Sequence, residues 1–239
     1  MRLDKYIQEK FNLKSRTYAE NLIRTGSVFV DGKVATKAGE YVSESSEVKI
    51  SDNKNFASQG AYKLEKAFEE WNIDVQGKSC VDIGCSNGGF TDCLLRRGAK
   101  CILAIDVGEC ALEKSLLDSR KVTFLRANAR ELPPLEQVDF LCSDLSFISL
   151  KHVLGSMYSL LKDGGQAVVL VKPQFELDKS ALNKNGIVKS EKLRKNALEN
   201  VKNNVKNCGF VILGETVSPI RFENKNIEYL LFLKKPQTT

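Results

Sequence analysis

The stretch Ser79-Cys80-Val81-Asp82-Ile83-Gly84-Cys85-Ser86-Asn87-Gly88-Gly89-Phe90 decides the fold class of this chain. A short apolar run reaches Asp82, a loop with three glycines follows, and the next segment has the pattern of a helix that ends near Gly98. A strand that leads through a glycine loop into a helix is how α/β sheets build nucleotide-type pockets at the carboxyl ends of their strands. The stretch predicts such a pocket, although an ordinary strand-to-helix turn remains the alternative.

The spacing of the glycines limits the classes of ligand that the loop could bind. It runs Gly84-x-x-x-Gly88-Gly89, which differs from the dinucleotide fingerprint Gly-x-Gly-x-x-Gly, and no Gly-Lys-Ser/Thr ending indicates a phosphate loop. A second acid, Asp106, ends the apolar run that begins at Cys101. In nucleoside-binding sheets an acid at this point accepts hydrogen bonds from ribose hydroxyls. Two acids at successive strand ends therefore favour a nucleoside-containing cofactor over a plain turn.

Apolar runs alternate with helical patterns through the rest of this region. An amphipathic helix with Leu64, Ala67, Phe68 and Trp71 on one face precedes the glycine loop, and a basic helix is predicted over 189–207. A loop is predicted over 177–187, and Gly164-Gly165 precede the fifth strand. The seven predicted strands cover residues 79–82, 101–106, 122–125, 138–144, 167–171, 210–213 and 227–233. This alternation predicts a Rossmann-like α/β fold with a seven-stranded, mainly parallel sheet covered by helices on both faces.

The amino-terminal part has a different pattern. Two short amphipathic helices are predicted over 2–10 and 16–25, the second with Ser15 as its N-cap. A hairpin with an Asp31-Gly32 turn follows, and then a short strand over 48–50. These elements predict a small α+β domain over 1–50, a polar linker over 51–59 and the larger domain over 60–239.

Composition excludes several classes of protein. No apolar run of the 239 residues approaches the ~18 that a membrane helix needs, and the charged amino terminus has no signal-peptide core. The seven cysteines are scattered without Cys-x-x-Cys spacing, and there is a single histidine, His152. These features predict a cytoplasmic protein with free thiols and no metal site.

The net charge of +6 is concentrated near the two ends of the chain. Residues 1–26 carry six Lys and Arg against three acids, and residues 172–239 carry thirteen against seven. Basic ends around a near-neutral centre are typical of a nucleic-acid binder, and a merely soluble basic protein is the alternative.

Residues 1–50 resemble the S4 RNA-binding domain. The matching residues are Arg2-Leu3-Asp4, Ser15-Arg16, Ile23-Arg24-Thr25-Gly26 and Val28-x-Val30-Asp31-Gly32-Lys33. Basic side chains of such a module contact RNA phosphates and so position the nucleic acid, whereas a solvated charged face is the alternative. The residues predicted to bind RNA are Arg2, Lys14, Arg16, Arg24 and, in the later loop, Lys184.

The whole chain resembles the TlyA family of ribosomal RNA 2′-O-methyltransferases, historically called haemolysins. The likeness is carried by Asp82–Leu94 around the glycine loop, Ala104–Gly108, Asp144–Ser149, Val171–Glu176 and Ser218-Pro219-Ile220 before Glu228. Gln59 and Asn185 depart from the family pattern, at an arginine and a glycine respectively. The resemblance implies S-adenosylmethionine as the cofactor and ribosomal RNA or a ribosomal subunit as the partner. The cofactor residues that it implies are Asp82, Gly84, Cys85, Ser86, Gly88, Gly89, Phe90, Asp106, Val107, Asn128 and Ala129.

The resemblance also implies a catalytic tetrad of Lys63, Asp144, Lys172 and Glu228 that acts on a ribose 2′-hydroxyl of ribosomal RNA, in a cytidine. The residues agree with this chemistry, since Asp144 and Lys172 each lie at the end of a predicted strand and such strand ends meet beside the pocket. A ribose hydroxyl is a poor nucleophile until its proton is removed. We expect Lys172 to be the base, Lys63 to lower its pKa, and the two acids to orient the lysines and the ribose.

Three rival functions are less favoured by the sequence. Methylation of a base amino group usually needs Asn/Asp-Pro-Pro-aromatic where this chain has Ser143-Asp144-Leu145-Ser146, and Cys142 has no base at hand for methylation of cytosine C5. A non-catalytic RNA-binding or ribosome-assembly protein with a relic pocket is the second rival. A pore-forming haemolysin is the third, and no apolar span supports it.

Overall fold

The chain folds into two compact units, Met1–Asn55 and Phe56–Thr239. A computed structural model describes residues 1–13, 15–24, 27–31, 33–35, 37–43, 45–50, 56–58, 60–220 and 225–237. Each unit has its own hydrophobic core. Phe56 belongs to the second unit, where its ring meets the edge of Tyr62 at 5.3 Å between centroids. The second unit therefore begins before residue 60, where we expected it to start.

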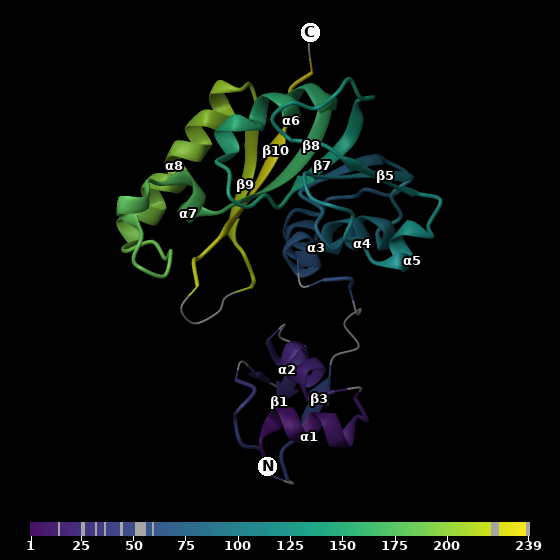
Figure 1. Ribbon diagram of the computed structural model, residues 1–239, viewed down its shortest axis with the longest axis vertical. Helices are drawn as coiled ribbons and strands as arrows, with labels where there is room; N and C mark the ends of the chain where they lie inside the picture. Colours follow the sequence, from purple (N-terminus) through teal and green to yellow (C-terminus); the bar gives the residue numbers. More distant parts are fainter. Residues whose placement is uncertain are drawn as a thin grey trace. The chain divides into compact units, whose positions relative to one another are not determined.

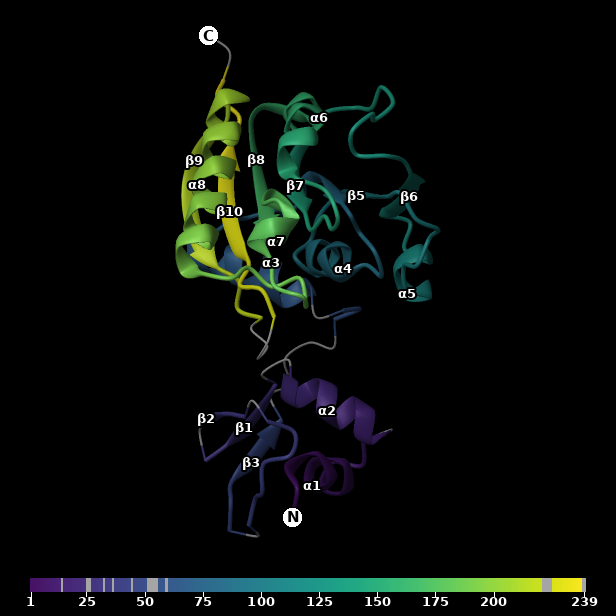
Figure 2. The same ribbon diagram turned by 60° about the vertical axis from the view of Figure 1, so that its left-hand side comes forward.

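The first unit pairs two helices with a small antiparallel sheet (Figure 2). The helices are α1 (Leu3–Lys10) and α2 (Arg16–Arg24), and the strands, in the order β2-β1-β3, are β1 (Val28–Val30), β2 (Lys33–Val34) and β3 (Val48–Ile50). Ser15 Oγ accepts a hydrogen bond from the Tyr18 amide at 3.1 Å, which caps α2 as predicted. The core is small and contains Leu3, Ile7, Ala19, Ile23, Val28, Ala35, Val42 and Val48.

The second unit is built on a seven-stranded sheet in the order β6-β5-β4-β7-β8-β10-β9, which confirms the predicted fold class. Its strands are β4 (Ser79–Ile83), β5 (Cys101–Asp106), β6 (Val122–Arg126), β7 (Val138–Ser143), β8 (Leu161–Val171), β9 (Val211–Val217) and β10 (Tyr229–Lys234). β10 lies between β8 and β9 and runs antiparallel to both. The chain moves outward from β4 to β6 and then returns to β7 on the other side of β4, so the sheet reverses its order there.

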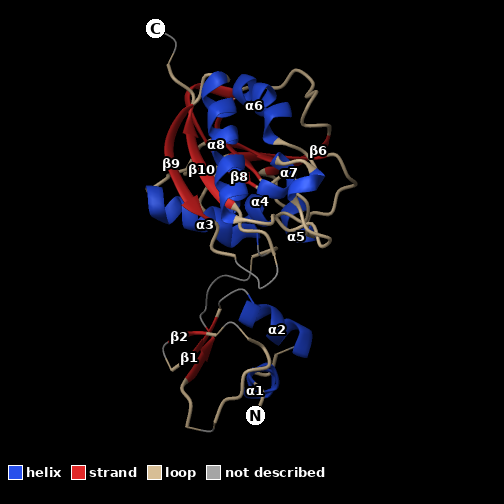
Figure 3. Ribbon diagram, turned by 90° about the vertical axis from the view of Figure 1, so that its left-hand side faces the viewer, coloured by secondary structure: helices blue, strands red, loops and turns tan. Residues whose placement is uncertain are grey.

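Helices cover both faces of this sheet, as Figures 1 and 3 show. The helical segments are α3 (Gly60–Trp71), α4 (Gly89–Arg96), α5 (Lys114–Leu117), α6 (Leu154–Leu160), α7 (Pro173–Glu176) and α8 (Glu191–Asn207), with 3-10 turns at Leu150–His152 and Lys179–Ala181. Side chains of α3, α4 and α5 share one hydrophobic cluster with the sheet, and those of α6 and α8 share the other. No described helix has both the length and the apolar character needed to cross a membrane.

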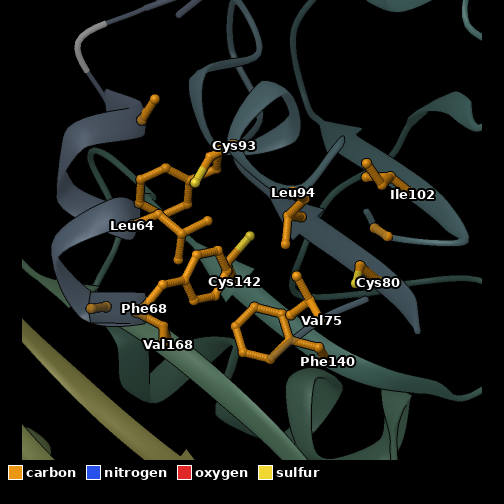
Figure 4. Close-up of a cluster of buried hydrophobic side chains, with 14 of the residues drawn as sticks. Leu64, Phe68, Val75, Cys80, Cys93, Leu94, Ile102, Phe140, Cys142 and Val168 are labelled. Carbon is orange, nitrogen blue, oxygen red and sulfur yellow. The ribbon is translucent and has the colours of Figure 1, made fainter. Parts of the chain in front are cut away.

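The alternation of side chains along each strand divides the core between the two faces. Cys80 in β4 belongs to the cluster under α3 and α4, whereas its neighbour Val81 belongs to the opposite cluster. Figure 4 shows the first cluster, in which Leu64 and Phe68 of α3 lie near Phe140 of β7. Because both faces are buried, the sheet holds the ends of its strands in fixed positions relative to one another.

Three sequence expectations need correction. The fifth strand begins at Leu161 and not at residue 167, because a bulge opposite β7 accommodates Gly164, whose φ is +78°. The short turn at Lys179–Ala181 interrupts the predicted loop. Glu228 lies just before β10 and not inside an apolar strand, so a carboxylate at this position is not surrounded by the core.

Candidate functional site

The carboxyl ends of β4, β5, β7 and β8 meet where the sheet reverses its order, which is where α/β sheets place ligands. The glycine loop leaves β4 at this point, and its Gly84 and Cys85 amides donate to the Ile105 carbonyl at 2.8 and 3.1 Å. Gly84 has φ +85°, and a Cβ there would lie 2.9 Å from the carbonyl oxygen of Asp144. Glycine is needed at this position both for its backbone conformation and for the close approach of the segment after β7.

Asp106 at the end of β5 holds the loop from the other side. Its carboxylate accepts hydrogen bonds from the Ser86 amide and the Gly108 amide, both at 2.9 Å. A carboxylate oxygen accepts more than one hydrogen bond, so Asp106 keeps capacity for a ligand hydroxyl. The acid predicted to bind a ribose therefore also fixes the loop beside it.

Two adjoining cavities open at these strand ends. The larger cavity has a volume of about 930 Å³ and the smaller about 570 Å³. They share five wall residues, Gly84, Ser86, Asp144, Ser146 and Phe147. Among the predicted cofactor residues, the smaller cavity is lined by Gly84, Ser86, Asp106, Val107, Asn128 and Ala129, and the larger by Gly84, Cys85, Ser86, Gly89 and Phe90.

Two of the predicted cofactor residues line neither cavity. Asp82 is fully buried within β4 and accepts a hydrogen bond from Thr91 Oγ1 at 2.7 Å. Burial raises its pKa to about 7, with a further contribution from the charge of Asp144. Gly88 precedes α4 with φ +92°, in a place where a Cβ would collide with Leu116. Asp82 and Gly88 therefore stabilise the glycine loop without lining either cavity.

The structure brings the four residues of the predicted tetrad together at the wall of the larger cavity. Asp144 bridges the two lysines, with Oδ2 3.1 Å from Lys63 Nζ and Oδ1 2.6 Å from Lys172 Nζ. Lys63 Nζ also donates to Glu228 Oε2 at 2.8 Å. The result is a continuous chain of ion pairs in the order Glu228, Lys63, Asp144, Lys172.

Strand register explains this meeting of residues that are far apart in the sequence. Tyr229 at the start of β10 pairs with Val171 at the end of β8 in antiparallel register, which places Glu228 opposite Lys172. Ile83 pairs with Ser143, so the residues that follow β4 and β7 also lie side by side. Lys63 reaches the same point from the first turns of α3. A cation there is unfavourable for the helix dipole, and the two carboxylates compensate for it.

The charges of the tetrad balance one another. Burial alone would raise the pKa of Asp144, but the nearby ammonium groups of Lys63 and Lys172 lower it below its usual value. Burial likewise lowers the pKa of Lys63, and the charges of Asp144 and Glu228 outweigh this and raise it. Lys63 and Asp144 are therefore held in their charged forms. The influence of Lys63 on Lys172 stays a prediction.

Sequence reasoning missed three residues of this site. Ser146 accepts a hydrogen bond from Lys172 Nζ at 2.7 Å, and Phe147 projects with 89% of its surface exposed at the junction of the two cavities. Phe147 has φ +64°, an unusual backbone for a bulky residue, and its ring lies 5.2 Å from that of Phe175. Glu176 accepts from Ser149 Oγ at 2.5 Å and from the Leu150 amide at 2.9 Å. In the sequence, the only indication of a role for these three residues is that they lie in the segments after β7 and β8.

The predicted RNA-binding residues of the first unit are described in part. Asp4 is fully buried and pairs with both Arg2 and Arg16, at 2.8 and 2.9 Å, so these two guanidinium groups lie together and remain about half exposed. Hydrogen bonds from Arg2 and then Arg16 lower the pKa of Asp4 to about 2, against the effect of burial. Lys14 and the side chain of Arg24 lie outside the described residues, as does Gln59. In the second unit, Lys184 is exposed on a turn beside Asn185, which lines the larger cavity.

No group of three or more His, Cys, Asp and Glu side chains suited to a metal ion occurs among the described residues. The single histidine, His152, lies exposed at the end of the 3-10 turn after β7. The polar groups that line the two cavities include lysines, an arginine, carboxylates, amides and hydroxyls.

Comparison with known proteins agrees with this division into two units. The chain matches the profile of the FtsJ-like methyltransferase family over residues 56–235 and that of the S4 domain over residues 1–48. It is 37% identical to the 16S/23S rRNA (cytidine-2′-O)-methyltransferase TlyA of Mycobacterium tuberculosis, over 98% of this chain and 89% of that protein. It is also 37% identical to Hemolysin A of Brachyspira hyodysenteriae, over 96% of this chain and 98% of that protein.

A solved structure gives the same result. A candidate hemolysin from Streptococcus thermophilus superposes with a TM-score of 0.74 at 35% identity, over 100% of this chain and 90% of that protein. The resemblance inferred from the motifs of the sequence is confirmed by these matches.

Proposed function

The chain belongs to the FtsJ-like methyltransferase family, and from this premise we propose that it transfers a methyl group from S-adenosylmethionine to the 2′-hydroxyl of a cytidine in ribosomal RNA. The observation that carries the proposal is the tetrad, in which Asp144 holds Lys63 and Lys172 at the wall of a large open cavity. The relative named as a (cytidine-2′-O)-methyltransferase supports the choice of nucleoside. Since its substrate is ribosomal RNA, we place the activity in the cytoplasm.

The residues of the smaller cavity fit the proposed cofactor. Asp106 offers carboxylate oxygens for ribose hydroxyls, Asn128 offers an amide for the edge of a base, and Val107 and Ala129 offer apolar contacts for its faces. The shared wall leads from this cavity to the tetrad, so a nucleoside in the smaller cavity would direct its amino-acid tail along the glycine loop. When bound, S-adenosylmethionine supplies a methyl group on a positively charged sulfur, and the carbon–sulfur electron pair stays with the sulfur as the methyl group bonds to the ribose oxygen.

The chain itself has to align the ribose hydroxyl and remove its proton. Lys172 is the base in this proposal, because its nitrogen lines the larger cavity beside the junction with the smaller one. Asp144 fixes that nitrogen, and Lys63 and Glu228 complete the charge balance around it. General-base assistance of this kind contributes roughly 10²- to 10⁴-fold to a rate.

RNA binding is proposed from both units. In the first unit, Arg2 and Arg16 present two guanidinium groups side by side, an arrangement suited to phosphates. In the second, Phe147 exposes an aromatic face at the junction of the cavities, where an unstacked base would stack on it. The S4 match of the first unit supports the same partner.

The test is methyl transfer by the purified chain to ribosomal subunits, with S-adenosylmethionine labelled in its methyl group. Digestion to nucleosides should place the label on 2′-O-methylcytidine. Label on a base would show a different methyltransferase activity and contradict the role of the tetrad. RNA binding without transfer to any subunit or naked ribosomal RNA would instead favour a ribosome-assembly protein with an unused pocket.

A further inference from the structure

The two lysines of the tetrad differ in their polar partners. Lys63 Nζ is held by two carboxylates, those of Asp144 and Glu228. Lys172 Nζ is held by one carboxylate, Asp144 Oδ1 at 2.6 Å, and by the neutral hydroxyl of Ser146 at 2.7 Å. Both partners of Lys172 come from the segment that follows β7. The two lysines of the tetrad therefore have different polar surroundings.

This difference matters because a base must act as a neutral amine. A neutral lysine side chain has two N–H donors and one lone pair on its nitrogen, whereas the ammonium form has three donors. If Asp144 and Ser146 each accept one N–H, both donors of the neutral amine are used. Its lone pair then occupies the remaining tetrahedral position, and only 11% of the Lys172 side chain is exposed, on the wall of the larger cavity.

We propose that Ser146 is a positioning residue that aims the lone pair of Lys172 at the ribose hydroxyl. The inference rests on the proposed function, since it requires Lys172 to be the base. Without the hydroxyl, the amine would rotate about its last carbon–nitrogen bond, and the lone pair would face the cavity for only part of the time. Such alignment of reacting groups is a large part of enzymatic rate enhancement.

Ser146 is itself held in place from both sides. Before it, the Asp144 amide donates to the Ile83 carbonyl at 3.2 Å, and the chain passes against Gly84. After it, Glu176 binds the Ser149 hydroxyl and the Leu150 amide. The segment from Asp144 to Leu150 is thus fastened at both ends, and the hydroxyl that faces Lys172 lies between the two attachments.

The charged groups around Lys172 do not depend on the Ser146 hydroxyl. The described residues whose charges face it are Asp144 directly, Lys63 and Glu228 beyond Asp144, and Lys225 on the wall of the same cavity. Removal of the Ser146 hydroxyl leaves all of these charges unchanged. It removes only one hydrogen-bond acceptor of Lys172 Nζ, so a loss of rate reports on the position of the amine.

The experiment compares single-turnover methyl transfer by wild type, Ser146→Ala, Ser146→Thr and Lys172→Ala across pH 5 to 9. Ser115→Ala, an exposed serine of α5, is the matched control. We expect Ser146→Ala to slow transfer roughly 10- to 50-fold at the optimum. Ser146→Thr, which keeps a hydroxyl, should stay within about fivefold of wild type. Affinity for S-adenosylmethionine and the thermal unfolding midpoint should match those of Ser115→Ala.

Two results would overturn the inference and leave the proposed function intact. One is a wild-type rate in Ser146→Ala while Lys172→Ala is inactive. The other is a slower Ser146→Ala that threonine does not rescue, because this would indicate a structural role. Normal activity in Lys172→Ala would instead contradict the proposed function itself.

Discussion

The two cavities are built by different physical means. The smaller one owes its shape to backbone, since Asp106 and the Ile105 carbonyl hold the glycine loop through main-chain amides. The larger one owes its character to side-chain charges, which form a chain of ion pairs from Glu228 to Lys172. Mutations should therefore be able to separate cofactor binding from methyl transfer, although the two cavities share a wall.

After the loss of Lys172 itself, Lys63→Met should produce the largest effect of a change confined to the larger cavity. It removes the cation between Asp144 and Glu228 and leaves two partly buried carboxylates close to each other. We expect at least a 100-fold fall in the rate of methyl transfer. Isothermal titration should find the affinity for S-adenosylmethionine within about twofold of wild type. A large loss of cofactor affinity would show that the two cavities do not act separately.

Asp106→Asn tests the smaller cavity, because Asp106 lines only that one of the two cavities. It removes a charged acceptor from the ribose and weakens the hold on Ser86 and Gly108. Loss of a hydrogen bond to a charged group predicts weaker cofactor binding on the order of 30-fold. The rate at saturating cofactor should change by only a few-fold. Steady-state kinetics separate the two, and a fall in kcat alone would contradict the assignment.

Glu176→Ala tests the shared wall. Glu176 fastens the segment that carries Asp144, Ser146 and Phe147, and this segment borders both cavities. We expect about tenfold losses in both transfer rate and cofactor affinity, since small displacements of positioned groups are costly. Glu176→Gln can still accept from the Leu150 amide and donate to Ser149, so it should restore most of both. An effect on one quantity alone would mean that the wall is not shared in function.

The smallest expected effects concern Asp82 and Asp144, two acids at neighbouring strands whose pKa values shift in opposite directions. The pKa of Asp82 is raised to about 7 by burial, whereas the pKa of Asp144 is lowered because two lysines outweigh its burial. A raised pKa in the folded state means that Asp82 stabilises the fold at acidic pH, and that this contribution is lost as pH rises from about 4 through about 7. Asp144 has the opposite sign and loses its contribution as pH falls below its unfolded pKa of about 4.

Asp82→Asn should therefore become more stable relative to wild type as pH rises. The difference in thermal unfolding midpoint should grow by roughly 3–6 °C between pH 5 and pH 8. Differential scanning calorimetry at each pH measures this. A difference that stays constant with pH would mean that Asp82 does not titrate in this range.

The sequence predicted the features that depend on local pattern. The glycine loop, the acids at strand ends and the seven strands follow from periodicity and glycine spacing, and the fold class is confirmed. The convergence of Lys63, Asp144, Lys172 and Glu228 was implied by family resemblance, and the structure brings them together. Their exact pairing depends on strand register, which local pattern does not encode.

What could not be predicted depends on non-local geometry. Ser146 and Glu176 are ordinary polar residues whose roles arise only when the segments after β7 and β8 lie together. Asp82 was expected to bind the cofactor, and its full burial follows from helix and strand packing around β4. The early start of β8 depends on a register shift in its pairing with β7.

The most direct test of the central claim measures methyl transfer and cofactor binding together in Lys172→Ala. Transfer to ribosomal RNA should be abolished, by at least 1,000-fold, while the affinity for S-adenosylmethionine stays within about twofold of wild type. Transfer at a near-normal rate would contradict the assignment of Lys172 as the base. Loss of cofactor affinity in parallel with activity would contradict the separation of the two cavities.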